Sequence, residues 1–63
     1  MTIRDLTNNI ELQGDFSVRV YDEAKEKYIF EKPLTDQTSK KYFDFEVKYI
    51  YSKDNVIVLE VVK

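Results

Sequence analysis

The seven residues VIVLEVV, at positions 56–62, most constrain how this chain can fold. A half-buried strand alternates apolar and polar residues, whereas this segment is apolar on both faces except at Glu60. Such a strand must therefore be shielded from water on both sides. In a chain of 63 residues that is difficult, because a domain of this size buries only about 60% of its unfolded surface.

Small domains are commonly stabilised by disulfides, metals or oligomerisation. The chain has neither Cys nor His, which excludes disulfides and thiolate metal sites and removes the commonest general base. We therefore expect a homo-oligomer, a dimer or a tetramer. Its predicted interface is formed by Val56, Val58, Val61 and Val62. The alternative is a sheet that simply retains a slightly apolar outer face.

The remaining periodicity predicts one helix and three further strands in a single domain, residues 1–63. Thr2 and Asp5 form a capping pattern, and Ile3 and Leu6 follow helical spacing, which predicts a helix over residues 2–8. Strands are expected over residues 15–21, 27–32, 41–51 and 56–62. The predicted fold class is α+β: a short N-terminal helix packed on a four-stranded antiparallel β-meander that oligomerises through its C-terminal edge strand.

Alternation within the strands predicts which side chains face the core. Tyr28 and Phe30 are expected to point inward from the second strand. The long third strand is expected to point five side chains inward: Phe43, Phe45, Val47, Tyr49 and Tyr51. Residues 34–40 are expected to form a loop or one helical turn, and Asp54 and Asn55 a tight turn, because both tolerate a left-handed backbone.

Charge and targeting patterns place few limits on function. The net charge of −2 lacks the strong basic excess typical of DNA-binding domains. The N-terminus has no signal-peptide pattern, and no apolar run approaches the roughly 20 residues that span a membrane. Together with the absence of Cys, this predicts a cytoplasmic protein without a membrane partner.

Carboxylates are the only candidates for catalytic chemistry. A single Gly excludes the Gly-rich phosphate-binding loops. Asp15, Asp22, Asp44 and Glu46 lie at strand starts or on the expected outward face, where hard oxygen ligands could hold Mg²⁺ and activate water. The alternative, which the frequency of acidic residues favours, is a solvated face with cross-strand ion pairs.

Basic and aromatic residues interleave in KKYFDFEVKYIY, at positions 40–51. Sheets that bind single-stranded nucleic acid place aromatic rings beside cations. Arg19, Lys41 and Lys48 are the candidate nucleic-acid contacts. The alternative is a core of aromatic residues beside a solvated face, because acidic residues lie among these cations.

Two stretches resemble small proteins of prophages and mobile elements in Firmicutes. The first is TIRDL followed by QGDFSVRVYDE, and the second is VKYIYSKDNVIVLEV. Together they cover roughly residues 2–23 and 47–62. Within that group, the resemblance extends to a gut-phage anti-CRISPR family, whose members antagonise the type II CRISPR nuclease. The family is associated with a coactivator-like sheet that binds single-stranded DNA, with oligomers and with nicking of supercoiled DNA.

The resemblance implies that Asp15 is the residue for nicking, with Mg²⁺ as the implied cofactor and supercoiled double-stranded DNA as substrate. Nicking would remove the supercoiling that helps a guide RNA to open its target. Two alternatives remain. One is a non-enzymatic, oligomeric protein-binding module of a mobile element, with a CRISPR nuclease as one partner. The other is an accessory protein without nucleic-acid contact.

Overall fold

The computed structural model describes all 63 residues. It contains one α-helix, one 3₁₀ helix and four strands. Their bounds are α1 Ile3–Asn9, β1 Phe16–Asp22, β2 Lys27–Pro33, η1 Gln37–Tyr42, β3 Glu46–Lys53 and β4 Val56–Val62. The α+β class, the short helix and the four-stranded sheet are confirmed. Neither helix has the length and apolar character required to cross a bilayer.

Helix α1 begins with the capping box that the sequence predicts. The Thr2 hydroxyl accepts from the Asp5 backbone N–H, and the Asp5 carboxylate accepts from the Thr2 N–H, both at 3.1 Å. These bonds satisfy two backbone donors that a helix otherwise leaves free. Ile3 is fully buried and attaches the helix to the sheet.

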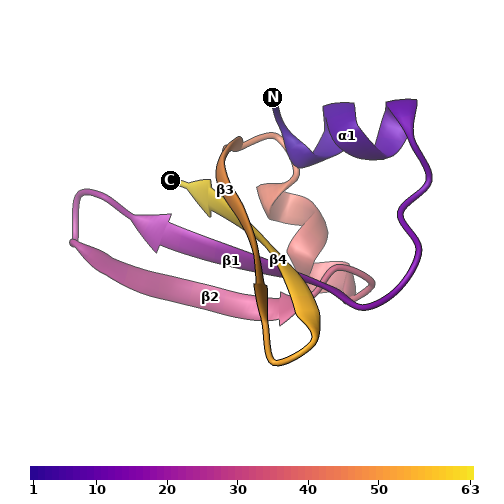
Figure 1. Cartoon of the computed structure of the whole chain (residues 1–63). Coiled ribbons are helices and arrows are strands. Elements are labelled where there is room, and N and C mark those ends of the chain that lie inside the picture. The colour runs from indigo at the N-terminus through magenta and orange to yellow at the C-terminus, as the bar shows by residue number, and fades with distance from the viewer.

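The sheet is mixed rather than purely antiparallel. Its strand order is β2-β1-β4-β3, with β1 and β4 parallel and the two outer pairs antiparallel. Parallel neighbours require a crossover connection. Here residues 34–45 form it, running from the end of β2 through η1 to β3 (Figure 1). The predicted antiparallel meander, with the C-terminal strand at an edge, is therefore wrong.

The central position of β4 explains its apolar sequence within one chain. It is hydrogen-bonded on both sides, and its residues Val58, Leu59 and Val61 are at most 1% exposed. Leu59 and Val61 point into the core, whereas Val58 lies on the opposite face and is buried there as well. The burial of Val58, Leu59 and Val61 within one chain accounts for most of the apolar segment that suggested an oligomer interface. The interface itself stays a prediction, with Val56 and Val62 half-buried and Val58 and Val61 buried.

The core lies on one face of the sheet, called the inner face. Five fully buried residues form it: Ile3, Val18, Val20, Leu59 and Val61. Both helices and the crossover pack against this face, and the crossover contributes the rings of Tyr42, Phe43 and Phe45. The opposite face, called the outer face, has no helix packed on it.

Two β-bulges reverse the predicted orientation of three tyrosines. In β3, Val47 pairs with Val61 but Tyr49 pairs with Glu60, so Lys48 is unmatched. A bulge adds one residue, and the alternation of faces shifts by one position. Tyr49 and Tyr51 therefore point to the outer face, whereas Phe43, Phe45 and Val47 face the core as predicted.

The second bulge lies in β2. Phe30 pairs with Val20, and Tyr28 pairs with Tyr21, leaving Ile29 unmatched. Phe30 is inward as expected, and the inward prediction for Tyr28 is wrong, because it is 46% exposed on the outer face. Strand β3 also begins five residues later than expected, because residues 37–42 form η1, the helical turn that was the alternative to a loop.

The β3–β4 connection is the tight turn that the sequence predicts. Asp54 and Asn55 have φ values of 53° and 66°. Two consecutive residues with positive φ match the right-handed twist of a hairpin. This turn fixes the register of β3 on β4, and thereby which β3 side chains reach the outer face.

Candidate functional site on the outer face of the sheet

The outer face combines tyrosines with charged residues. Strand pairing places on it Ser17, Arg19 and Tyr21 of β1, Tyr28 and Glu31 of β2, Tyr49, Tyr51 and Lys53 of β3, and Val56, Val58, Glu60 and Val62 of β4. Four of the five tyrosines of the chain are therefore on one side. A sheet face without a covering layer that gathers aromatic rings is a candidate binding surface.

Glu60 is the centre of this face. It is only 5% exposed, and no cation lies within 4.0 Å of its carboxylate. Tyr51 donates to its Oε1 at 2.8 Å and Tyr28 to its Oε2 at 3.3 Å. Burial of a carboxylate is unfavourable unless it is hydrogen-bonded. The two hydroxyls therefore hold a negative charge in the middle of the sheet.

Arg19 connects the tyrosines to one another. Its Nη1 donates to the Tyr51 hydroxyl at 3.0 Å, and its guanidinium lies 3.8 Å from the centre of the Tyr28 ring. Its Nε is buried and makes no hydrogen bond, although it lies 3.4 Å from Oε1 of Glu31. Arginine stacks on aromatic faces in this way. Arg19 is thus engaged within the protein.

This packing changes the acidity of two hydroxyls. Burial raises the pKa of Tyr51, and the hydrogen bond to Glu60 acts in the same direction, against the opposing effect of Arg19. Burial likewise raises the pKa of Tyr28, with a further contribution from the Glu60 charge. Both phenols are therefore held as neutral donors, the form that Glu60 requires.

A hollow of about 570 Å³ opens beside Glu60. We call it the tyrosine hollow. It is lined by Tyr21, Glu23, Glu26, Tyr28, Lys48, Tyr49, Glu60 and Val62. The rings of Tyr21 and Tyr28 meet edge to face with centroids 5.0 Å apart. The hollow is therefore formed by three rings and by carboxylates from β4 and from the β1–β2 turn.

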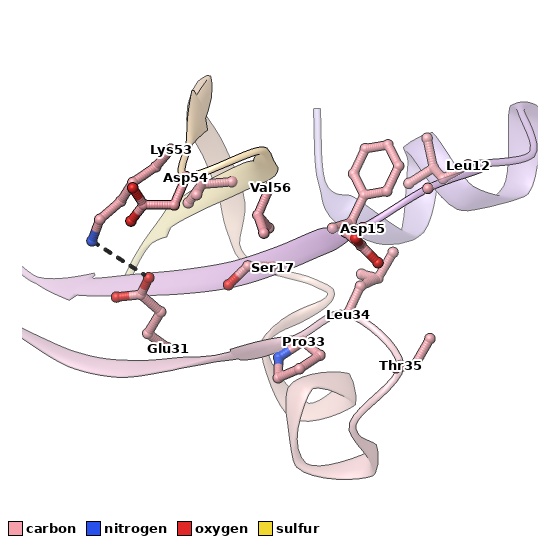
Figure 2. Close-up of a pocket in the computed structure, with 13 residues that line it drawn as sticks. Leu12, Asp15, Ser17, Glu31, Pro33, Leu34, Thr35, Lys53, Asp54 and Val56 are labelled. Atoms are coloured by element: carbon pink, nitrogen blue, oxygen red, sulfur yellow. Dashed lines mark ion pairs between the residues drawn. The ribbon is translucent and has the colours of Figure 1, made fainter.

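A second hollow, of about 470 Å³, contains the predicted nicking residue Asp15. Figure 2 shows Asp15 beside Leu12 and Leu34 at one end, whereas Glu31, Lys53 and Asp54 gather at the other. Lys53 lies 3.9 Å from Glu31 and forms an ion pair with it. No group of three or more acidic residues is arranged to hold a metal ion. Asp15 is thus exposed at a hollow but apart from the other carboxylates.

Only two of the three predicted nucleic-acid contacts lie on the same side of the sheet. Arg19 and Lys48 belong to the outer side of the sheet, and Lys48 lines the tyrosine hollow. Lys41 belongs to η1, which packs on the inner face, and its Nζ lies 5.3 Å from the Tyr42 ring. The three cations therefore do not form one continuous stripe.

The remaining candidate carboxylates have structural roles. The Asp44 carboxylate accepts a hydrogen bond from Nε of Arg4 at 2.6 Å, and this bond lowers the pKa of the carboxyl group. Glu46 forms an ion pair with the N-terminal amine at 2.6 Å. Asp22 is buried and accepts from the backbone of the β1–β2 turn. Each of these acids already has a partner within the chain.

The sequence predictions did not identify Glu60, Tyr28 or Tyr49 as site residues. Glu60 carries a signal in the sequence, because it is the only charge in a segment that is otherwise apolar. Tyr28 and Tyr49 carry no such signal in the sequence, since strict alternation predicts that they point into the core. Only the two bulges turn them outward.

Comparison with protein-family models finds no match, and no curated protein or solved structure matches the chain.

Proposed function

We propose that the chain is a small protein-binding module and that the outer face of its sheet is the contact surface. The observation that carries this proposal is the position of Tyr28 and Tyr49, which are 46% and 63% exposed above a buried carboxylate. Tyrosine is enriched where proteins meet, because it offers a large apolar ring and a polar tip. We place its action in the bacterial cytoplasm.

The proposal is supported by the interactions within the chain that order the side chains of the outer face. Hydrogen bonds fix Tyr51 and Tyr28 on Glu60, and Arg19 is stacked on Tyr28. A surface ordered before binding loses less conformational entropy when a partner arrives. The resemblance to anti-CRISPR proteins suggests a CRISPR nuclease as the partner to test first.

Site-specific photocrosslinking in bacterial cells tests the contact surface. A photoreactive phenylalanine analogue replaces Tyr49, and in a control it replaces Ile10, which is similarly exposed at 53% and lies after α1. We expect an adduct of one defined mass from position 49, removed by an excess of the unmodified protein. Equal yields from both positions, or no adduct at 49, would contradict the proposal.

Self-association is a separate outcome of the same experiment. The interface predicted from Val56, Val58, Val61 and Val62 includes two residues that are already buried within one chain. Val56, Val58 and Val62 lie on the outer face, so a dimer or tetramer that leaves the fold intact would meet there through the exposed side chains around them. An adduct of twice the chain mass, together with a concentration-dependent sedimentation coefficient, would identify a second copy as the partner.

The second candidate function is anti-CRISPR protection by nicking of supercoiled DNA. It is motivated by the resemblance of residues 2–23 and 47–62 and by the exposure of Asp15 at its hollow. Asp15 would act with Mg²⁺, which carboxylate oxygens bind. Supercoiled plasmid and Mg²⁺ are incubated with the wild type and with Asp15→Asn, purified identically. Nicking by the wild type alone would support this function, and equal nicking by both or none by either would reject it.

A further inference from the structure

The tyrosine hollow has an unbalanced charge. Glu23, Glu26 and Glu60 line it with a single cation, Lys48. None of these four groups takes part in an ion pair within 4.0 Å, whereas the acids elsewhere on the sheet, such as Glu31 and Glu46, do. The side chains that line the hollow therefore carry an excess of negative charge, and Arg19, the next cation, reaches Glu60 only through the Tyr51 hydroxyl.

The aromatic rings of the hollow also favour a positively charged ligand. Tyr21, Tyr28 and Tyr49 line the hollow, and the faces of aromatic rings attract cations. The chain shows this preference itself, since Arg19 stacks on the Tyr28 ring at 3.8 Å. Carboxylates and rings around one hollow are therefore complementary to a positively charged group with an apolar stem.

We propose that the tyrosine hollow receives a lysine or arginine side chain from a basic segment of the partner protein. This inference rests on the proposed binding function and specifies its chemistry. The charged head would lie near the carboxylates of Glu23, Glu26 and Glu60. The aliphatic stem would contact the rings of Tyr28 and Tyr49 and the half-buried Val62. A nucleic-acid backbone would instead bring its phosphates onto three carboxylates.

The test uses the full ¹⁵N-labelled chain and short peptides followed by NMR. The probes are a capped peptide of alternating glycine and arginine, its lysine counterpart, and a citrulline counterpart, which is similar in shape to arginine but uncharged. We expect the arginine and lysine peptides to shift the amides of Tyr21, Tyr49 and Glu60, and the citrulline peptide to leave them unmoved. Added salt should weaken the shifts.

Matched variants localise the effect. Tyr49→Leu keeps an apolar side chain but removes the ring and should weaken peptide binding about two- to fivefold. Glu23→Gln should weaken it about two- to threefold. Glu11→Gln makes the same charge change at an exposed glutamate outside the hollow and should leave affinity unchanged.

Three results would overturn the inference: equal shifts with the citrulline peptide, shifts centred on the Asp15 hollow, or equal shifts of the tyrosine-hollow amides by a thymidine oligonucleotide added without any peptide. The inference and the proposed function fail separately. A partner crosslinked at Tyr49 without any peptide binding would retain the binding module and reject its cation site. Peptide binding without a crosslinked partner would retain the cation site and reject the binding module.

Discussion

The Tyr51 hydroxyl donates a 2.8 Å hydrogen bond to Oε1 of Glu60, a carboxylate that is 5% exposed in the central strand of the sheet. The same hydroxyl accepts from Arg19 at 3.0 Å. Tyr51 is therefore a neutral link between a cation and an anion that do not touch. It connects the edge strand β3, across β4, to β1.

Substitution of Tyr51 tests the strength of this link. Tyr51→Phe removes the hydroxyl and leaves a buried carboxylate oxygen without its shortest bond, so we expect a loss of about 1–3 kcal/mol in the free energy of unfolding. Urea titration followed by circular dichroism measures it. The control is Tyr49→Phe, since the Tyr49 side chain is 63% exposed and surface changes usually stay within about 0.5 kcal/mol. Equal losses in both variants would contradict the assigned role.

Alkaline pH is expected to destabilise the fold through the same tyrosines. The pKa values of Tyr28 and Tyr51 are raised in the folded state, so the unfolded chain releases these protons first. The contribution of these two hydroxyls to the free energy of unfolding is therefore fully present below the pKa of tyrosine in the unfolded chain, about 10, and decreases as pH rises above that value. Thermal unfolding between pH 8 and pH 11 measures this loss. A smaller decline for Tyr51→Phe than for the wild type is expected, and parallel declines would contradict the coupling.

Hydrogen exchange should report the central position of β4. Its strand is paired on both sides, whereas β2 and β3 each have one neighbour. Backbone amides of paired interior strands open mainly through global unfolding, and edge amides open locally. We therefore expect the slowest exchange at Leu59 and Val61, and faster exchange along β2. Exchange of β4 as rapid as that of β2 would argue for the edge position that the sequence predicted.

The Asp54–Asn55 turn makes a conformational prediction. Asn55 has φ 66°, and a side chain with a Cβ carbon that lacks local hydrogen bonding is strained there by about 1–2 kcal/mol. Asn55→Ala should lower the free energy of unfolding by about 1 kcal/mol, and Asn55→Gly, which truncates the side chain further, should not. Equal destabilisation by both would attribute the effect to lost side-chain contacts instead of backbone strain.

Local features were predictable because they depend on neighbouring residues. The capping box of Thr2 and Asp5 and the positive-φ turn at Asp54 and Asn55 use hydrogen bonds and sterics within a few positions. The alternation of apolar and polar residues in β1 puts Val18 and Val20 on one face, and that face is in the core together with Leu59 and Val61 of β4.

The candidate site was not predictable in the same way. A β-bulge shifts alternation by one position, and the sequences around Ile29 and Lys48 contain no glycine or other local mark of it. The outward tyrosines, and with them the hollow around Glu60, depend on how β2 and β3 fit against their neighbours. Asp15, by contrast, is exposed as expected, and its role in nicking stays a prediction.

The sequence by itself determined the helix start, the turn at Asp54 and Asn55, and the apolar segments, VIVLEVV among them. Which element covers the inner face of that segment was decided only by the tertiary structure. Pairing β1 with β4 in parallel requires residues 34–45 to cross the inner face, and this brings Tyr42, Phe43 and Phe45 onto the core. Strand order arises from contacts between residues far apart in the chain, which no local periodicity encodes.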